Sequence, residues 1–190
     1  MRKFLVLAVL VFLAWWLFVR PGSTEFGCEA AAATAHAASD DCPSSAEAAA
    51  GNSSWAADRM NSISDSKLTT GLLYDSDGTE HALTSGYDDD ADRVTELLDE
   101  LGAPFPESGP HPAAAHVEPK AAAQLRDGDQ DIGVMVINNE GGVCSGRKGL
   151  SCQEVLPLLL AAGTKLYVWS PGADEPVEFE GRDSRWAITW

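Results

Sequence analysis

The chain has 190 residues, 45% of them hydrophobic, which is enough for one globular domain with appended segments and excludes a chain that is disordered throughout. Asp and Glu number 29 against 13 Lys and Arg, and the net charge is -16. This acidic excess excludes a protein that coats nucleic acid through a broadly basic surface, but it is compatible with an enzyme that uses one local basic loop.

The N-terminal segment, residues 1–20, predicts a membrane anchor or an export signal. Basic residues Arg2 and Lys3 precede an uninterrupted apolar run over residues 4–19. The run is short for a spanning helix of about 20 residues, and a signal peptide has the same basic start and apolar centre. In either case we expect the protein to be membrane-anchored through residues 4–19 or secreted.

Residues 21–66 predict a flexible tether, because Ala, Ser, Asp and Asn dominate them without a sustained apolar period. Short helices can form in parts of this segment, such as residues 47–50. Cys28 and Cys42 both lie in it, and in an oxidising compartment they can pair with each other. The folded domain is then expected over residues 67–190.

The first element expected in the domain is a β-hairpin with strands over residues 70–74 and 79–84, joined by a turn that ends in Asp-Gly. A helix follows over residues 88–101, with carboxylates at its N-terminal end and apolar residues on one face. The acidic run over residues 88–92 is interpreted as the cap of this helix, because it lacks the ligand spacing of a calcium loop.

The second half alternates helices with strands. Residues 132–137 are apolar at every position, which is typical of a strand covered on both faces. Pro157 predicts a kink or a new start within the helix that contains it. The expected elements are helices over 116–126 and 152–162, strands over 132–137 and 165–170, and edge strands over 177–180 and 186–190. This order predicts an α/β fold in which helices cover a sheet.

Two cysteines of the domain lie around the start of its third helix. Cys144 follows the central strand, and Cys152 falls in the first helical turn, because Ser151 and Glu154 form a capping-box signature. At that place the helix dipole favours a thiolate, which is the form of cysteine that binds metal.

His116 and Glu118 occupy the start of the second helix, because the ring of Pro119 prevents that helix from beginning much earlier. One His and two Cys provide three ligands for a zinc ion and leave the fourth position for water, as in catalytic zinc sites. Glu118 lies beside a ligand without being needed as one, so it is placed to move protons.

Two alternatives to this zinc site stay open. A disulfide between Cys144 and Cys152 would use the same sulfur atoms, and the N-terminal segment points to an oxidising destination. Among the other histidines His111 is the best substitute ligand, whereas His36 and His81 have no comparable neighbours in the sequence.

His-Val-Glu at a helix start, then a strand, then two cysteines around the next helix start resembles the zinc-dependent nucleoside and nucleobase deaminase superfamily. More narrowly, HVEPKAAAQLRDGDQDIGVMVINNEGGVC with SCQEVLPLLLAAGTKLYVWSPG resembles the bacterial DNA cytosine deaminase toxins, over residues 85–172. The superfamily usually has two residues between its cysteines, whereas residues 145–151 separate them here. The resemblance implies a cytidine deaminase-like, three-layer α/β/α fold with a mixed sheet of about five strands.

The resemblance also implies roles for individual residues. His116, Cys144 and Cys152 would hold Zn²⁺, and Glu118 would shuttle protons while an activated water attacks C4 of cytosine and converts it to uracil. Candidate substrate contacts are Ser85, Tyr87, Asn138, Asn139, Arg147 and Lys148.

All of these candidate contacts except Ser85 have a structural alternative. Tyr87 is able to stack on a base or to be a half-buried core residue, and Asn138 and Asn139 are able to form a strand-ending turn. Arg147 and Lys148 form a basic pair between the expected ligands, which suits either a nucleic-acid phosphate or a solvated surface loop.

As a toxin, the protein would act on single- or double-stranded DNA and would be neutralised by an immunity protein that plugs its active site. Two other functions stay open at this point. One is a catalytically inactive deaminase-like domain that binds a partner, and the other is a deaminase of RNA or of free nucleosides.

Overall fold

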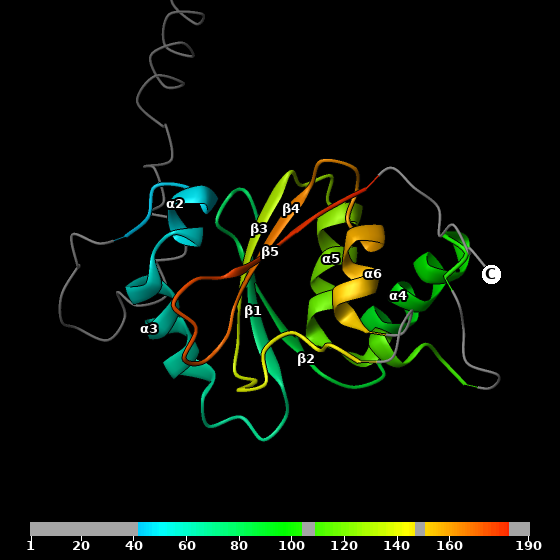
Figure 1. The fold of residues 1–190 in the computed structure, drawn as a ribbon, viewed down its shortest axis with the longest axis horizontal. Coiled ribbons are helices and arrows are strands. Elements are labelled where there is room, and N and C mark those ends of the chain that lie inside the picture. Colours follow the sequence, from blue (N-terminus) through cyan, green and yellow to red (C-terminus); the bar gives the residue numbers. More distant parts are fainter. Residues whose placement is uncertain (1–41, 104–108, 147–150, 183–190) are drawn as a thin grey trace, which may run out of the picture.

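The computed structural model describes residues 42–103, 109–146 and 151–182. Within them, five strands form one mixed sheet in the order β2-β1-β3-β4-β5 (Figure 1). The strands β3 and β4 are parallel, and the other neighbouring pairs are antiparallel. Their bounds are β1 (Thr70–Tyr74), β2 (Glu80–Thr84), β3 (Ile132–Ile137), β4 (Lys165–Trp169) and β5 (Val177–Glu180).

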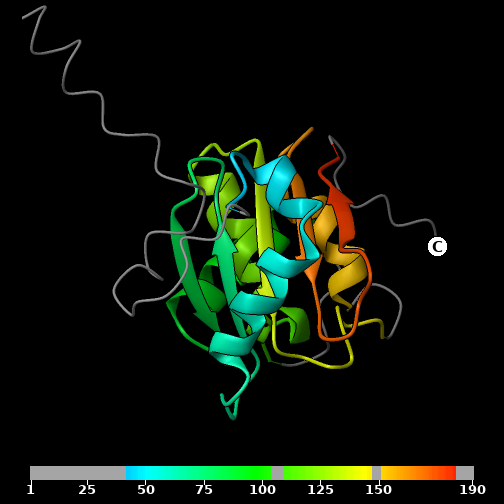
Figure 2. The same cartoon turned by 90° about the vertical axis from the view of Figure 1, so that its left-hand side faces the viewer.

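Helices cover both faces of this sheet. One face carries α2 (Ala46–Ala50) and α3 (Ser53–Ile63), which lie in front of the strands in Figure 2. The other face carries α4 (Asp89–Glu100), α5 (Val117–Asp127) and α6 (Cys152–Leu159), while the short 3-10 helix η2 (Pro112–Ala115) leads into α5. The expected three-layer α/β/α fold with a mixed five-stranded sheet is therefore confirmed.

The central strands supply both hydrophobic cores by simple alternation of their side chains. On β3, Met135 and Ile137 face the core beneath α4, α5 and α6, while Val134 and Val136 face the core beneath α2 and α3. Successive side chains of a strand point to opposite faces, so a strand between two helical layers must be apolar at every position. That is the pattern from which residues 132–137 were expected to form a central strand.

Small residues bring α5 close to the sheet. Its alanines Ala121, Ala122 and Ala123 are buried, and the strands below it present glycines. A Cβ atom on Gly133 would lie 2.7 Å from Cδ1 of Leu125, and one on Gly71 would overlap the end of Met135. The Cβ atom on Gly71 would also lie 3.4 Å from Val117, in the first turn of α5, and 3.4 Å from Ile137, so this turn sits against the end of β3, from which the chain leads to Cys144.

Within residues 42–66 the structure has α2, where a short helix was expected over residues 47–50, and also α3, and both pack onto the sheet, so this part of the segment is not a flexible tether. Asn52 caps α3 by accepting a hydrogen bond from the N–H of Trp55 at 2.9 Å. The indole of Trp55 is 3% exposed and packs edge-on against Tyr74 of β1, with ring centroids 5.0 Å apart. The sequence concealed this packing because the two helices bury mostly alanines, whose small side chains give no strong apolar period.

The remaining elements agree with the expected order. The hairpin and the helix that Asp88 caps lie where they were expected, and the final described strand is β5. However, α6 ends at Leu159 rather than at residue 162, although it continues through Pro157. The side chain of Arg126 donates hydrogen bonds to three carbonyl groups at this end of α6, those of Leu158, Leu159 and Leu160.

Several expectations fall on residues outside the described part. These are the anchor or signal over residues 1–20, Cys28, and the strand over residues 186–190. Cys42 is disulfide-bonded, and its pairing with Cys28 stays a prediction. Among the described residues no helix is long and apolar enough to cross a membrane.

Candidate metal and catalytic site

His116 lies at the junction between η2 and α5. Its extended backbone, with φ −91° and ψ 150°, ends the 3-10 helix and precedes the first helical residue, Val117. Pro119 follows within the first turn of α5, where its missing N–H costs no helical hydrogen bond. The helix therefore begins where Pro119 was expected to make it begin, with the His116 side chain at its N-terminal end.

Cys144 and Cys152 meet despite the seven residues between them. The backbone N–H of Cys152 donates to Sγ of Cys144 at 3.2 Å, and the N–H of Gln153 donates to the carbonyl of Cys144 at 3.3 Å. Two of the N–H groups that the start of α6 leaves without helical partners are thus satisfied by Cys144. The side chain of Ser151, from which a capping box was expected, instead pairs with the carboxylate of Glu154 at 3.0 Å.

The three expected ligands form one cluster. Nδ1 or Nε2 of His116 and Sγ of Cys144 and Cys152 all lie within 4.8 Å of one another, and Sγ of Cys152 is 3.3 Å from Nδ1 of His116. A tetrahedral zinc ion, with Zn–S of about 2.3 Å and Zn–N of about 2.0 Å, sets its ligand atoms about 3.5–3.8 Å apart. The donor set and its spacing therefore fit zinc, with one coordination position left for a small molecule.

Both cysteines of the cluster are free rather than joined in the alternative disulfide, so their sulfur atoms are available to a metal once they are deprotonated. The hydrogen bond with the Cys152 thiol lowers the pKa of Cys144 to about 6, and the Cys152 N–H and His116 act in the same direction. The same hydrogen bond, together with burial, raises the pKa of Cys152. A thiolate was expected at Cys152, but the contacts of the metal-free cluster favour one at Cys144.

Glu118 lies on the first turn of α5, two residues after His116, and its side chain is 2% exposed. Burial raises the pKa of this carboxyl group. The nearby charge of His116 lowers that pKa and the charge of Cys144 raises it, so the carboxyl group interacts electrostatically with the cluster. A buried carboxyl group that holds a proton more tightly than usual is suited to act as both acid and base near pH 7.

The candidate contacts Ser85 and Tyr87 lie on the loop between β2 and α4. The backbone N–H of Gly86, between them, donates to the carbonyl of Ala115 at 2.8 Å, which ties the loop to the residue before His116. Tyr87 is 61% exposed, so it is not the half-buried core residue that was the alternative interpretation. The backbone of the loop is therefore held next to the start of α5, and the aromatic ring that the loop carries is accessible.

Asn138 and Asn139 lie at the end of β3 and are occupied by internal hydrogen bonds. Asn138 accepts from the N–H of Thr70 at 2.8 Å and donates to three carbonyl groups of the segment before β1, those of Ile63, Ser66 and Leu68. Asn139 closes a turn with Gly141 and Gly142. These contacts fit the structural alternative, and substrate contact by either residue stays a prediction. Arg147 and Lys148 lie outside the described residues.

The other histidines of the described part do not join the cluster. His111 is fully buried and accepts a hydrogen bond from the N–H of Ala113 at 3.2 Å, so it caps η2 rather than replacing His116. Nε2 of His81 lies 2.9 Å from the carboxylate of Asp75 in the β1–β2 hairpin.

Lys120 is a residue of this region that the sequence analysis overlooked. Its side chain is fully buried on α5, where its ammonium group donates to the carbonyl of Thr84 at 2.7 Å and to the carboxylate of Asp88 at 2.6 Å. A lysine directly before three buried alanines was the signal, because that position of a helix otherwise requires a small or apolar side chain.

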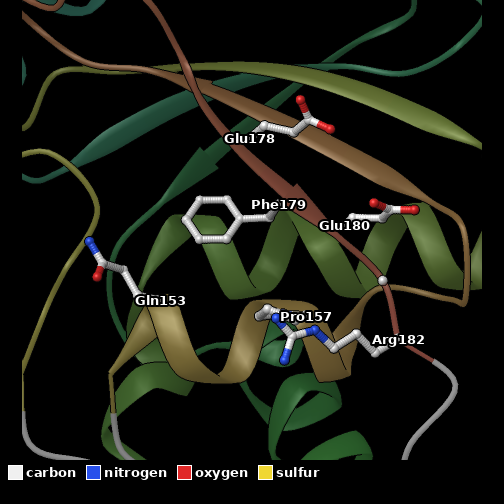
Figure 3. Close-up of a pocket in the computed structure, with 7 residues that line it drawn as sticks. Gln153, Pro157, Glu178, Phe179, Glu180 and Arg182 are labelled. Atoms are coloured by element: carbon white, nitrogen blue, oxygen red, sulfur yellow. The ribbon is translucent and has the colours of Figure 1, made fainter.

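A surface pocket of about 540 Å³ lies between α6 and β5 (Figure 3). Phe179 and the charged residues Glu178, Glu180 and Arg182 are among the residues that line it. Gln153 also lines it and is the neighbour of Cys152. This pocket is lined neither by the three candidate ligands nor by Glu118. It is therefore separate from the cluster and says nothing about the chemistry there.

Comparison with known proteins identifies a protein family that the chain matches. The family model described as SCP1.201-like deaminase matches residues 43–185. The matched range contains the whole candidate site and also α2 and α3, which agrees with their packing onto the sheet. No curated protein matches the chain.

Proposed function

The chain belongs to the SCP1.201-like deaminase family, and we propose that it is a zinc-dependent hydrolase that converts cytosine to uracil in DNA. The observation that carries the proposal is the cluster of His116, Cys144 and Cys152, whose ligand atoms lie within 4.8 Å of one another, together with the buried carboxyl group of Glu118, which interacts electrostatically with His116 and Cys144. This is the donor set and the acid–base group that deamination of a nucleobase requires.

His116, Cys144 and Cys152 would hold the metal through one nitrogen and two sulfur atoms. Zinc bound there would activate a water molecule as the nucleophile at neutral pH. Binding requires both thiols to lose their protons, and Cys144, whose pKa is lowered to about 6, would do so first. The N–H of Cys152 continues to donate to the Cys144 sulfur and would keep that ligand oriented.

Glu118 would carry the protons of the reaction. Its carboxylate accepts a proton from the attacking water and passes it to N3 of the cytosine ring. It then accepts the second proton of that water from the new C4 hydroxyl group and delivers it to the departing amino group. The C4–N bond breaks, a C4–O bond forms, and ammonia leaves, so one water is consumed for each uracil made. Burial raises the pKa of Glu118, which keeps the proton available at the carboxyl group for the second transfer.

The choice of DNA as substrate and the role as a bacterial toxin are supported by the resemblance of residues 85–172 to the DNA cytosine deaminase toxins. The exposed ring of Tyr87, on a loop whose backbone is tied to the residue before His116, is available to stack on a base. We also propose an immunity protein as the partner that blocks the site, and export or membrane anchoring through residues 4–19.

The proposal is tested with the full chain and a panel of cytosine-containing substrates: single-stranded DNA, double-stranded DNA, RNA and free cytidine. Uracil or uridine is measured by mass spectrometry. We expect uracil in DNA, and Glu118→Gln should abolish its formation while zinc content and the folded structure are kept. If only RNA or only cytidine is converted, the proposed DNA substrate is wrong. No difference between the wild-type protein and Glu118→Gln would remove the proposed catalytic role.

A further inference from the structure

The buried ammonium group of Lys120 binds both ends of one short loop. It donates to the carbonyl of Thr84, the last residue of β2, and to the carboxylate of Asp88, the residue that caps α4. Only Ser85, Gly86 and Tyr87 lie between these two residues. We call these three residues the Tyr87 loop.

Two backbone hydrogen bonds complete the attachment of the Tyr87 loop. The N–H of Gly86 donates to the carbonyl of Ala115 at 2.8 Å, and the N–H of Ser85 donates to the carbonyl of Thr69 at 2.8 Å. Gly86 has φ 136°, a backbone conformation that residues other than glycine rarely adopt. The path of the loop is thus fixed at its ends and at its centre, while the ring of Tyr87 stays exposed.

The same helix carries both the loop's anchor and the candidate metal ligand. Lys120 lies one helical turn after His116, on α5, so the distance between the loop and the start of α5 is set by a single rigid element. The side chain of Lys120 has no exposed surface, whereas that of Asp88 is half-exposed. Loss of the ammonium would leave the Thr84 carbonyl and the Asp88 carboxylate without this donor.

We propose that Lys120 is a positioning residue, which holds the Tyr87 loop against the start of α5 and so sets the affinity for the nucleotide that stacks on Tyr87. The inference rests on the proposed function, because the nucleotide that stacks on Tyr87 belongs to the proposed deaminase substrate. It differs from a role in stability alone, because it requires Lys120 and Tyr87 to act on substrate binding as a coupled pair.

The test is a double-mutant cycle on substrate KM with Lys120→Met, Tyr87→Ala and the double variant. Methionine matches the length of the lysine stem and removes the charge. We expect each single variant to raise KM about tenfold with a smaller effect on kcat, and the double variant to be no worse than Tyr87→Ala alone. Effects on KM that multiply in the double variant would overturn the inference.

Two further variants separate positioning from general stability. Asp88→Asn keeps the side-chain cap of α4 and weakens only the contact with Lys120, so KM should rise in the same direction by a smaller factor. Lys165→Met removes a lysine–carboxylate pair of the same type, with Glu178 at 2.7 Å on β4 and β5, and should leave KM unchanged. An equal rise in KM for Lys165→Met would contradict a specific role of Lys120.

Hydrogen exchange gives a readout that does not depend on deaminase activity. In Lys120→Met the Gly86 amide should lose its protection, because the hydrogen bond to Ala115 is no longer held, while the amides of β3 and β4 keep theirs. If the wild-type protein deaminates no substrate of the panel, the proposed function fails but this exchange result still tests the anchoring. Unchanged protection at Gly86 would overturn the inference.

Discussion

The backbone N–H of Cys152 donates a hydrogen bond to the sulfur atom of Cys144 over 3.2 Å, so the start of α6 binds one candidate ligand while its first residue supplies another. The positive end of the helix therefore stabilises negative charge on Cys144 rather than on Cys152. Because Cys152 is also 3.3 Å from Nδ1 of His116, this contact assembles all three donors at one place.

The first prediction concerns the reactivity of Cys144 in the metal-free protein. Its pKa is lowered to about 6, so most of it is thiolate at pH 7, whereas the buried Cys152 keeps its proton. Iodoacetamide at pH 7 should modify Cys144 before Cys152, and the rate should fall as the pH is lowered through 6. Mass spectrometry of the peptides measures both sites separately.

Zinc supplies the control for this experiment, because a metal-bound sulfur is protected from alkylation. Addition of zinc should suppress modification of Cys144, and magnesium, which prefers oxygen ligands, should not. Equal modification of the two cysteines, or no protection by zinc, would contradict the assignment.

The second prediction concerns pH and the ion pair of Asp88 with Lys120. Burial raises the pKa of Asp88, but the hydrogen bonds from Lys120 and from the Ala91 N–H outweigh burial, so the pKa is lowered. A carboxyl group with a lowered pKa adds stability above its unfolded value, about 3.9, and that stability is lost as the pH falls through the folded value. Asp88→Asn should therefore lower Tm at pH 7, and the difference in Tm should shrink at acidic pH.

Thermal unfolding of the two proteins between pH 3 and pH 7 measures this difference. The variant Asp89→Asn, one residue further along in the same helical turn, is the matched control and should show a smaller dependence on pH. A Tm difference for Asp88→Asn that grows as the pH falls would reverse the sign and exclude the ion pair as its cause.

The third prediction tests whether residues 42–66 belong to the folded domain. Trp55 is 3% exposed between α3 and the sheet, so Trp55→Ala should lower the free energy of unfolding by about 3–5 kcal/mol. Its exposed neighbour Ser54 is the control, and Ser54→Ala should change that free energy by no more than about 0.5 kcal/mol. Urea unfolding measures both variants. A small effect of Trp55→Ala would restore the interpretation of this segment as a tether.

The sequence was sufficient where one local pattern determines the structure. The fully apolar run of β3 and the Asp-Gly turn of the first hairpin each indicate their element without reference to the rest of the chain. Pro119 limits the start of α5 in the same way, and that limit placed His116 and Glu118 together at the helix start.

The sequence was insufficient where the structure depends on contacts between distant segments. The burial of α2 and α3 depends on the contact between Trp55 and Tyr74, and the alanine-rich sequence of these helices does not predict that contact. The preference for a thiolate at Cys144 depends on where the start of α6 lies in space, and the role of Lys120 depends on a loop more than thirty residues earlier in the chain. Local periodicity contains none of these relationships.

The central claim, that His116, Cys144 and Cys152 hold a zinc ion that deamination requires, is tested most directly by titrating the metal-free full chain with zinc and measuring bound metal and uracil formation on the same samples. We predict that activity rises in proportion to bound zinc up to one ion per chain, and that Cys152→Ser loses both. Full activity without zinc, or stoichiometric zinc with no product from any cytosine-containing substrate, would contradict the claim.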